Sequence, residues 1–562
     1  MSAPSFDVVV VGAGAGGSAA AWRLASHGQR VLLLDAGPAF DPASDYRLHQ
    51  PDWELTRFPE KPGSRGRYTF APMQALDPAH DDLRSWNRIH GRFNRGNQRI
   101  ASGEGYHHVR GIGGSTLHYT GEAHRMNPHS MRLQADHGAG ADWPLDYAQL
   151  EPYYLEAEKL IGVAGPADPG DRWRSAPYPL PPHRLCRASR LLGKAADGLG
   201  WSWEVSPRAA LSLPYDGRLP CNYCGGCNRG CPRGDKGSAD VTFVAKARAS
   251  GRCDIRPGCA VVALVVGEGR RIAAVDYVGP DGKRVRVETP QLVLAGGAIE
   301  TPRLLLAHNA ANPRQRIAHE SGQLGRNLME SSGWTSVGLA PEDLASFGGL
   351  PADAICWKFN RPDAIEGVVG GYKLSTAIHE TDLAGPVAYA RRAIPGWGRR
   401  HKAQVREQFG RAVAVSATGE FLPNAGSFVD LDDARADDNG LPLARIHSHN
   451  DAMTLRRLAA MARSCRLLLQ AAGVETLVEE YGTHDFYSAA HVFGTCRMGS
   501  DPATSVVDAD LKAHGWQNLL ICDASVFPSS GGGEAPSLTI QALAIRAADR
   551  LATTHRPIGD TT

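Results

Sequence analysis

The opening 35 residues constrain the fold more than any other stretch of this sequence. Residues 7–11 are an aspartate followed by four valines, a pattern typical of a buried parallel strand, and a second apolar strand over 31–34 leads directly into Asp35. Between the strands a glycine turn matches G-x-G-x-x-G, and a helix of small residues is expected over 18–27. The glycines of this turn are Gly12, Gly14 and Gly17.

Each part of this pattern has a role in binding a dinucleotide. The first glycine permits a tight turn, the second lets the backbone approach a pyrophosphate, and the third lets the helix pack closely on the strand. The N–H groups at the start of the helix face the phosphates. Asp35 stands where an acid would bind a ribose hydroxyl. The stretch therefore predicts a dinucleotide-binding βαβ unit, and the alternative is a glycine turn in an ordinary α/β domain.

Length and charge limit the remaining possibilities. The chain has 562 residues, which is enough for two or more domains, and its formal net charge of +2 argues against an electrostatic partnership with nucleic acid. No apolar run reaches the roughly 18 residues that a membrane-spanning helix needs. The first strand begins so early that no signal peptide is expected, which favours a cytoplasmic protein or one exported together with a partner.

The rest of the chain divides by pattern. Residues 38–100 lack periodicity and are expected to cross the surface as a lid or an interface, with irregular padding as the alternative. Residues 259–289 predict a small antiparallel meander, and 291–294 predict another buried strand that ends in glycines. Alternating segments over 330–488 indicate a second, largely β domain that carries substrate specificity.

Four of the eleven cysteines lie within eleven residues. Their spacing, C-x₂-C-x₂-C-x₃-C-P, matches the run that binds iron–sulfur clusters in bacterial ferredoxins. Zinc, disulfides and a loop without metal remain alternatives. The candidate ligands are Cys221, Cys224, Cys227 and Cys231.

Five separated segments together resemble the glucose–methanol–choline (GMC) flavin oxidoreductases. They are the opening turn with Asp35; Gly113-Gly114-Ser115; Gly296-Gly297-Ala298 with the following Glu300-Thr-Pro302; Gly325-Arg-Asn-Leu328; and His491 to Gly499 with Asp523-Ala-Ser525 and 537–540. The resemblance implies an α/β fold with a Rossmann-like FAD-binding domain built from discontinuous segments. Inserted in it is an α+β substrate domain with a mainly antiparallel sheet. The implied division is 1–160 for the first FAD-binding part, including the excursion; 161–220 for a connection to the substrate domain; 221–329 for the cysteine loop and the second FAD-binding part; 330–488 for the substrate domain; and 489–562 for the third FAD-binding part.

The resemblance also assigns cofactor roles. The ADP half of FAD falls to the opening glycine turn and Asp35, and the isoalloxazine to the second glycine loop. His118 matches a position that in some members is bonded covalently to the flavin; a non-covalent histidine near the flavin edge is the alternative. The implied cofactor residues are Gly12, Gly14, Gly17, Asp35, Gly113, Gly114, Ser115, His118, Val262, Gly296, Asp523 and Ala524.

The catalytic residue that the resemblance implies is His491. It would take the hydroxyl proton as hydride leaves the adjacent carbon for flavin N5, and an ordinary imidazole, with a pKa of about 6.5, suits this task. The family usually has a second His or Asn just before the last segment, but here that position is Ala535. Glu534 or a residue from the other domain would have to replace it, unless the site works with one histidine.

The cysteine loop is similar to that of the large subunits of FAD-dependent sugar dehydrogenases, which bind a [3Fe–4S] cluster. The leading hypothesis is thus a dehydrogenase that oxidises a sugar or polyol and passes electrons to a cytochrome or quinone. Such enzymes are exported with a small partner subunit, which would place this protein in the periplasm or at a membrane; otherwise it is cytoplasmic. The alternatives are an oxidase that uses O₂ on an apolar or aryl alcohol, and a flavoprotein without alcohol-oxidising activity.

Overall fold

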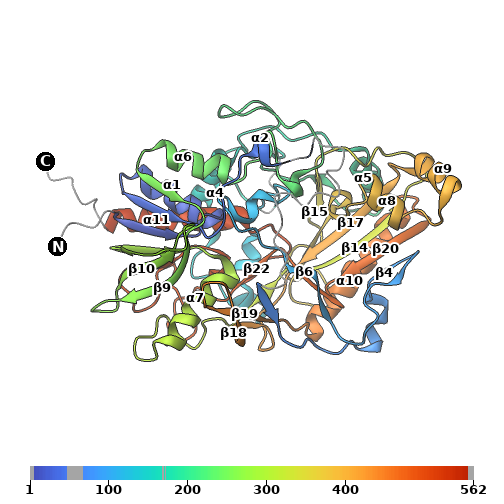
Figure 1. Ribbon diagram of the computed structural model, residues 1–562. Helices are drawn as coiled ribbons and strands as arrows, with labels where there is room; N and C mark the ends of the chain where they lie inside the picture. Colours follow the sequence, from blue (N-terminus) through green and yellow to red (C-terminus); the bar gives the residue numbers. More distant parts are fainter. Residues whose placement is uncertain (1–5, 47, 49–66, 168–169, 171, 555–562) are drawn as a thin grey trace.

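The structure is a computed structural model that describes residues 6–46, 48, 67–167, 170 and 172–554. Part of the expected excursion, residues 47 and 49–66, lies outside the described residues. The described chain forms two sheet-based halves, one of which carries α1 and α11 (Figure 1).

The first half is built on a five-stranded parallel sheet. Its strand order is β23-β12-β1-β2-β8, so segments far apart in sequence lie side by side. β1 pairs with β12 from Val8↔Gln291 and with β2 from Val8↔Val31. The strands are β1 Val8–Val11, β2 Val31–Leu34, β8 Cys253–Arg256, β12 Gln291–Leu294 and β23 Leu519–Ile521. The side chains of β2, β12 and β23 are buried throughout, as expected for the central part of a parallel sheet covered on both faces.

Helix α1, Ala15–Ser26, begins three residues earlier than the sequence pattern predicts. Gly16 and Gly17 lie in its first turn because there is no room there for a side chain. A Cβ on Gly16 would lie 1.8 Å from the Cys522 carbonyl oxygen, and one on Gly17 would lie 1.9 Å from that of Gly12. Glycine at both positions therefore lets the helix begin directly against the ends of the strands. Helix α1 packs against α11, Ser537–Thr554.

The predicted meander is confirmed as a three-stranded antiparallel sheet in the order β11-β10-β9. Its strands are β9 Ala260–Val266, β10 Ile272–Val278 and β11 Arg284–Glu288.

The second half is an eight-stranded antiparallel sheet in the order β5-β4-β20-β14-β17-β16-β15-β7. Helix α10, Ala452–Ala471, packs on β14 and β17 (Figure 1). The strands are β4 Trp86–Asn87, β5 Gly91–Arg92, β7 Glu204–Val205, β14 Ser332–Leu339, β15 Ala354–Cys356, β16 Tyr372–Thr376, β17 Ala412–Gly419 and β20 Thr476–Gly482. The predicted fold class, a discontinuous Rossmann-like domain with an antiparallel substrate domain, is confirmed; the domain boundaries stay a prediction.

Smaller elements connect the halves. The remaining strands are β3 Tyr68–Phe70, β6 Ile100–Tyr106, β13 Met329–Glu330, β18 Phe428–Ala436, β19 Pro442–His447, β21 Phe486–Ala489 and β22 Val492–Phe493; the remaining α-helices are α2 Pro42–Asp45, α3 Leu133–His137, α4 Tyr147–Ile161, α5 Arg187–Gly198, α6 Ala245–Ala249, α7 Gly297–Ala311, α8 Pro386–Arg392 and α9 Gly398–Gln408. Among the described residues, no helix is both long enough and apolar enough to span a membrane.

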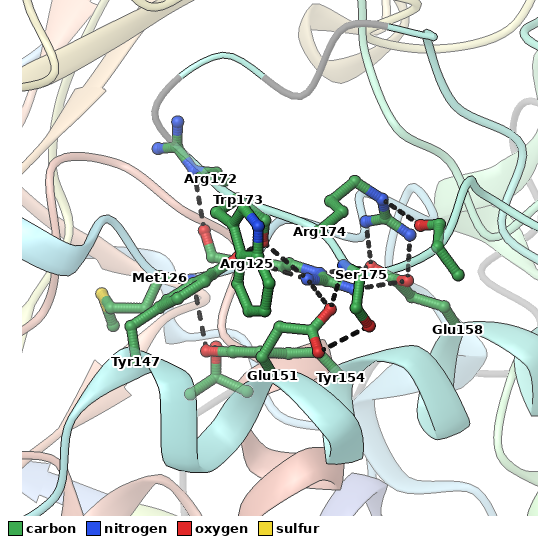
Figure 2. Close-up of polar contacts among 12 residues, drawn as sticks. Arg125, Met126, Tyr147, Glu151, Tyr154, Glu158, Arg172, Trp173, Arg174 and Ser175 are labelled. Atoms are coloured by element: carbon green, nitrogen blue, oxygen red, sulfur yellow. Dashed lines mark hydrogen bonds and ion pairs between the residues drawn. The ribbon is translucent and has the colours of Figure 1, made fainter.

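A buried charge network fixes the segment after residue 171 onto α4 (Figure 2). Arg125 donates from Nε and Nη2 to the two carboxylate oxygens of Glu158, at 2.8 and 3.0 Å, and Arg174 donates to the same carboxylate. Glu151 accepts from Arg125 and from the backbone and hydroxyl of Ser175. Charges are tolerated in this interior because each is paired and hydrogen-bonded.

Candidate functional site

A cavity of about 850 Å³ extends from the glycine turn of the parallel sheet to the inner wall of the antiparallel sheet. Most of the residues assigned to the cofactor line it, as does His491. Those in its wall are Gly12, Gly14, Asp35, Gly114, Ser115, His118, Val262, Gly296, Asp523, Ala524 and His491. Gly17 and Gly113 lie behind the wall and shape the two turns. The structure thus brings the separated segments to one place, and the individual roles stay predictions.

The two glycine turns touch each other at the cavity. A Cβ on Gly114, where φ is +55°, would lie 2.6 Å from the Cα of Gly14. The Gly113 N–H donates to the Ala13 carbonyl at 2.9 Å and holds the turns together. Gly12, at φ +100°, leaves no room for a Cβ beside the Ala295 carbonyl oxygen, which would be 2.4 Å away. Because no side chain fits at these positions, a ligand can approach the backbone of both turns closely there, and we call this part of the cavity the seat.

The donors at this seat fit the ADP half of FAD. Gly14, Ala15 and Gly16 at the start of α1 line the cavity, and the first turn of α1 contains no acidic side chain. Their N–H groups and the helix dipole favour a pyrophosphate. The described residues therefore fit the dinucleotide that the sequence predicts.

Two buried aspartates organise the backbone around the seat. Asp35 accepts from the Ala13 and Gly37 N–H groups, both at 2.8 Å, which fixes the glycine turn. Asp523 accepts from Gly297 N–H at 2.9 Å and from the Thr301 hydroxyl at 2.6 Å, at the start of α7. Burial raises the pKa of both carboxyls, and these hydrogen bonds work in the opposite direction. The sequence did not reveal these scaffold contacts; the predicted ligand contacts of both aspartates stay predictions.

His491 precedes β22 and is half-buried at the cavity wall. Burial lowers its pKa to about 4; the Glu122 carboxylate raises it and the Lys373 ammonium lowers it further. Ser331 fixes the ring through its hydroxyl, 3.2 Å from Nδ1, and its N–H donates to the His491 carbonyl. At neutral pH the imidazole is uncharged and can accept a proton.

An ion pair that the sequence analysis missed lies in the same wall. Lys373 Nζ, on β16, is 2.5 Å from Glu122 Oε1, and both residues line the cavity. Burial acts to raise the pKa of Glu122, but Lys373, His124 and Arg208 outweigh it and hold this pKa at about 2. No local motif could have revealed the pair, because its members are 251 residues apart.

Ala535 is buried and lines the cavity with a methyl group. Its N–H donates to His124 Nδ1 at 3.2 Å. The neighbouring Glu534 forms an ion pair with Arg172 and accepts from Asn360 Nδ2 at 2.9 Å. Arg172 is itself anchored to the network of Figure 2 through the Arg125 carbonyl. Glu534 is therefore held in a network outside the cavity wall.

His118 follows the second glycine turn and lies against the cysteine loop. Its Nδ1 is 2.9 Å from the Asn228 carbonyl oxygen. Because a carbonyl only accepts, Nδ1 carries the proton and the ring's lone pair is on Nε2. This tautomer would suit a bond through Nε2, and the covalent link stays a prediction.

The four cysteines of the loop differ in exposure. Cys227 is buried, Cys224 is exposed, and Cys221 and Cys231 are intermediate. Burial, followed by the Asp235 carboxylate, raises the pKa of Cys221 and raises that of Cys231 to about 12, so both are neutral thiols at pH 7. Among the described residues no group of three or more His, Cys, Asp or Glu side chains is arranged to hold a metal ion. The role of the four thiols as metal ligands stays a prediction.

Comparison with known proteins agrees with this geometry. Residues 110–331 and 423–544 match the family described as GMC oxidoreductase, and 10–42 match the NAD(P)-binding Rossmann-like domain. The fructose dehydrogenase large subunit of Gluconobacter japonicus is 30% identical, covering 97% of this chain and 98% of its own. The 2-methyl-1,2-propanediol dehydrogenase of Mycolicibacterium austroafricanum is 27% identical, covering 100% and 97%.

A solved structure, pyridoxine 4-oxidase from Mesorbium loti, shares the fold with a TM-score of 0.63 at 19% identity, covering 98% of this chain and 100% of its own. The full-length relatives and the family matches confirm the resemblance drawn from the separated motifs. The chain is therefore an oxidoreductase of the GMC family.

Proposed function

We propose that this protein is an FAD-dependent dehydrogenase that oxidises a hydroxyl group of a sugar or polyol. One observation carries the proposal: a neutral imidazole faces a cavity whose far wall is lined by hydroxyl groups of the antiparallel sheet. These are Thr335 on β14, Ser375 on β16, and Ser416 and Thr418 on β17. These hydroxyl groups offer both donors and acceptors to a polyhydroxylated substrate.

His491 is proposed as the catalytic base. When bound, FAD supplies the acceptor for the hydride that leaves the carbinol carbon. His491 takes the hydroxyl proton on Nε2, while Ser331 keeps the ring in place through Nδ1. The substrate loses one proton and one hydride in total and leaves as a carbonyl compound.

The experiment that tests the function is anaerobic flavin reduction with a panel of sugars, polyols and aromatic alcohols. Sugars or polyols should bleach the flavin, and turnover should be faster with an artificial acceptor than with O₂. Faster turnover with O₂ would support an oxidase instead. A flavin that no alcohol bleaches would refute alcohol oxidation.

The natural acceptor is proposed to be a cytochrome or quinone, reached with the help of a small partner subunit. Support comes from the relative named as the large subunit of a fructose dehydrogenase, a name that indicates an assembly in that protein. Copurification with the product of a neighbouring reading frame, followed by cytochrome reduction, tests this part.

Two finer proposals concern the cofactors. A covalent His118–flavin bond predicts that acid-precipitated protein stays yellow, whereas colourless protein refutes the bond. Iron–sulfur binding by the cysteine loop predicts brown absorbance beyond the flavin bands, together with iron and sulfide by chemical assay. No step of the reaction proposed above depends on either.

A further inference from the structure

We propose that Glu122 and Lys373 form the subsite that binds a neutral vicinal diol beside His491 and replaces the polar side chain absent at Ala535. This inference rests on the proposed function and adds the substrate class to it. Glu122 would accept a hydrogen bond from one hydroxyl of the diol. Lys373 would donate one to the neighbouring oxygen, which is the oxygen being oxidised.

The other candidates for the missing group are already engaged. Glu534 is held by Arg172 and Asn360, outside the cavity wall. His124 uses Nδ1 to accept from the Ala535 N–H, and its Nε2 is 3.2 Å from the Ser206 hydroxyl. Glu534 Oε2 is buried without a hydrogen-bond partner, but Glu534 lies outside the cavity wall, and both ring nitrogens of His124 are engaged.

Lys373 reaches this place because the loop before Ala535 has no side chain in its way. At Gly533, where φ is +103°, a Cβ would lie 2.9 Å from Lys373 Cγ and 2.1 Å from the Thr418 carbonyl oxygen. The lysine stem therefore crosses directly over the loop that carries Ala535. The same loop that lacks a polar side chain makes room for one from β16.

The ammonium and carboxylate retain hydrogen-bonding capacity at the cavity. An ammonium has three donors, and among the described residues Lys373 Nζ donates to Glu122 alone. Oε2 of Glu122 accepts no hydrogen bond from the described side chains or backbone, while Oε1 receives the lysine. The pair thus presents donors and an acceptor side by side, which is the pattern that two adjacent hydroxyls complement.

The pair also selects against charge. Glu122 is ionised at neutral pH and neutralises Lys373 at 2.5 Å, so the subsite carries no net charge. A sugar acid would place its carboxylate near the Glu122 carboxylate, where Lys373 is already paired. We therefore expect neutral polyols to be preferred over aldonates.

During oxidation the proton and the hydride leave by separate routes. The hydroxyl proton moves to His491, and the carbinol carbon would give its hydride to the acceptor that FAD supplies when bound, which leaves a carbonyl group. Negative charge on this oxygen is greatest as the proton leaves, and Lys373 stabilises it by hydrogen bonding without transferring a proton. Lys373 and His491 both line the cavity, and the Lys373 ammonium lowers the pKa of His491.

The test compares Lys373→Met, Glu122→Gln and the double variant, which leaves no unpaired buried charge. Lys358→Met, at an exposed lysine in the loop after β15, is the matched control. Stopped-flow flavin reduction is measured with a vicinal diol, the matched primary alcohol and an aldonate. Binding of each, or of a non-reducing analogue, is measured separately by perturbation of the flavin absorbance.

We expect Lys373→Met to lower the limiting reduction rate about 100-fold, the scale of removing one oxyanion donor. Added ethylammonium should partly restore that rate in Lys373→Ala. Glu122→Gln should weaken diol binding about tenfold and turn the binding preference toward the aldonate, because Lys373 is then unpaired. The double variant should bind the diol and the primary alcohol equally well, and Lys358→Met should match the wild type.

Two results would overturn the inference: reduction and diol binding unchanged in all three variants, or a wild-type protein that binds aldonates or isolated hydroxyls as well as diols. Failure of the proposed function gives a different result. In that case no alcohol reduces the wild-type flavin, yet the binding preference for a diol, and its reversal in Glu122→Gln, still reports on the subsite.

Discussion

The lowered pKa of His491 makes a sharp prediction for the pH dependence of flavin reduction. Below its pKa an imidazole is protonated and cannot serve as a base. With a pKa of about 4, about nine-tenths of the molecules keep a neutral His491 at pH 5. An ordinary histidine, with a pKa of about 6.5, would be neutral in about 3% of molecules at that pH. The two cases differ about 30-fold in expected rate.

The measurement is kcat/KM for flavin reduction between pH 4.5 and 8, because this ratio reports on groups of the free enzyme. The curve should stay nearly flat down to about pH 5 and still be at about three-quarters of its plateau at pH 4.5, because unit slope is reached only below a pKa of about 4. Glu122, with a pKa of about 2, stays ionised throughout and does not distort the profile. His491→Ala should lower the rate by about 10²–10⁴, the usual contribution of a general base, and remove the acid limb.

The control is recovery of full activity after return from pH 5 to pH 7.5, with circular dichroism recorded at both. An acid limb with an apparent pKa between 6 and 7, present in the wild type and absent in His491→Ala, would contradict the burial argument. An unchanged rate in His491→Ala would remove the base assignment itself.

Three further predictions concern packing and stability. Gly114→Ala should lower flavin occupancy, measured by the flavin-to-protein absorbance ratio, because the new Cβ would lie 2.6 Å from Gly14 Cα and the left-handed backbone adds about 1–3 kcal/mol of strain. The control is Gly282→Ala, which has a similar backbone with open space around it and should keep full occupancy. Equal loss of flavin in both variants would contradict the contact argument. In denaturant titrations, Glu158→Gln should lower the free energy of unfolding by about 3–5 kcal/mol, because two buried guanidinium groups lose their carboxylate partner. Glu156→Gln, which removes a partly exposed ion pair on the same helix, should lower it by less than about 1 kcal/mol. Similar losses in the two variants would argue against the network. The unfolding temperature should fall as the pH falls from 6.5 toward 4, because three histidines are protonated in the unfolded chain at these pH values but stay neutral in the folded protein. Each histidine lowers the free energy of unfolding by up to about 1.4 kcal/mol per pH unit. A constant unfolding temperature in this window would show that these histidines are not shielded from water. The three histidines, each with a pKa lowered to about 4 chiefly by burial, are His108, His379 and His491.

The sequence predicted the parallel sheet and its glycine turn because those properties are local. Four valines before a glycine turn specify a buried strand and the start of a helix regardless of the rest of the chain. The helix start expected from the sequence was three residues too late, because the crowding at Gly16 comes from the Cys522 carbonyl, more than 500 positions away. Boundaries set by such distant contacts leave no local trace.

The polar half of the site was beyond the reach of motifs for the same reason. Lys373 lies on a strand whose neighbours give no hint of a charged partner, and Glu122 follows the second glycine turn without any spacing rule. The departure at Ala535 was the one sequence signal that something else must supply a polar group. Of the two replacements considered, Glu534 is held by Asn360, and a residue of the antiparallel sheet, Lys373, is the one we propose.

The cysteine loop supports the cavity through backbone contacts that do not involve its thiols. Lys236 Nζ donates to the carbonyls of Leu117 and Cys227, both at 2.8 Å, and His118 donates to the Asn228 carbonyl. Cysteine-to-serine substitutions leave all of these bonds possible, because they involve only main-chain oxygens of the loop. If such variants lose iron but keep flavin, the thiols bind metal and the backbone supports the cavity independently. If they lose flavin as well, packing of the buried thiols contributes to the wall, and metal content alone cannot explain the loss.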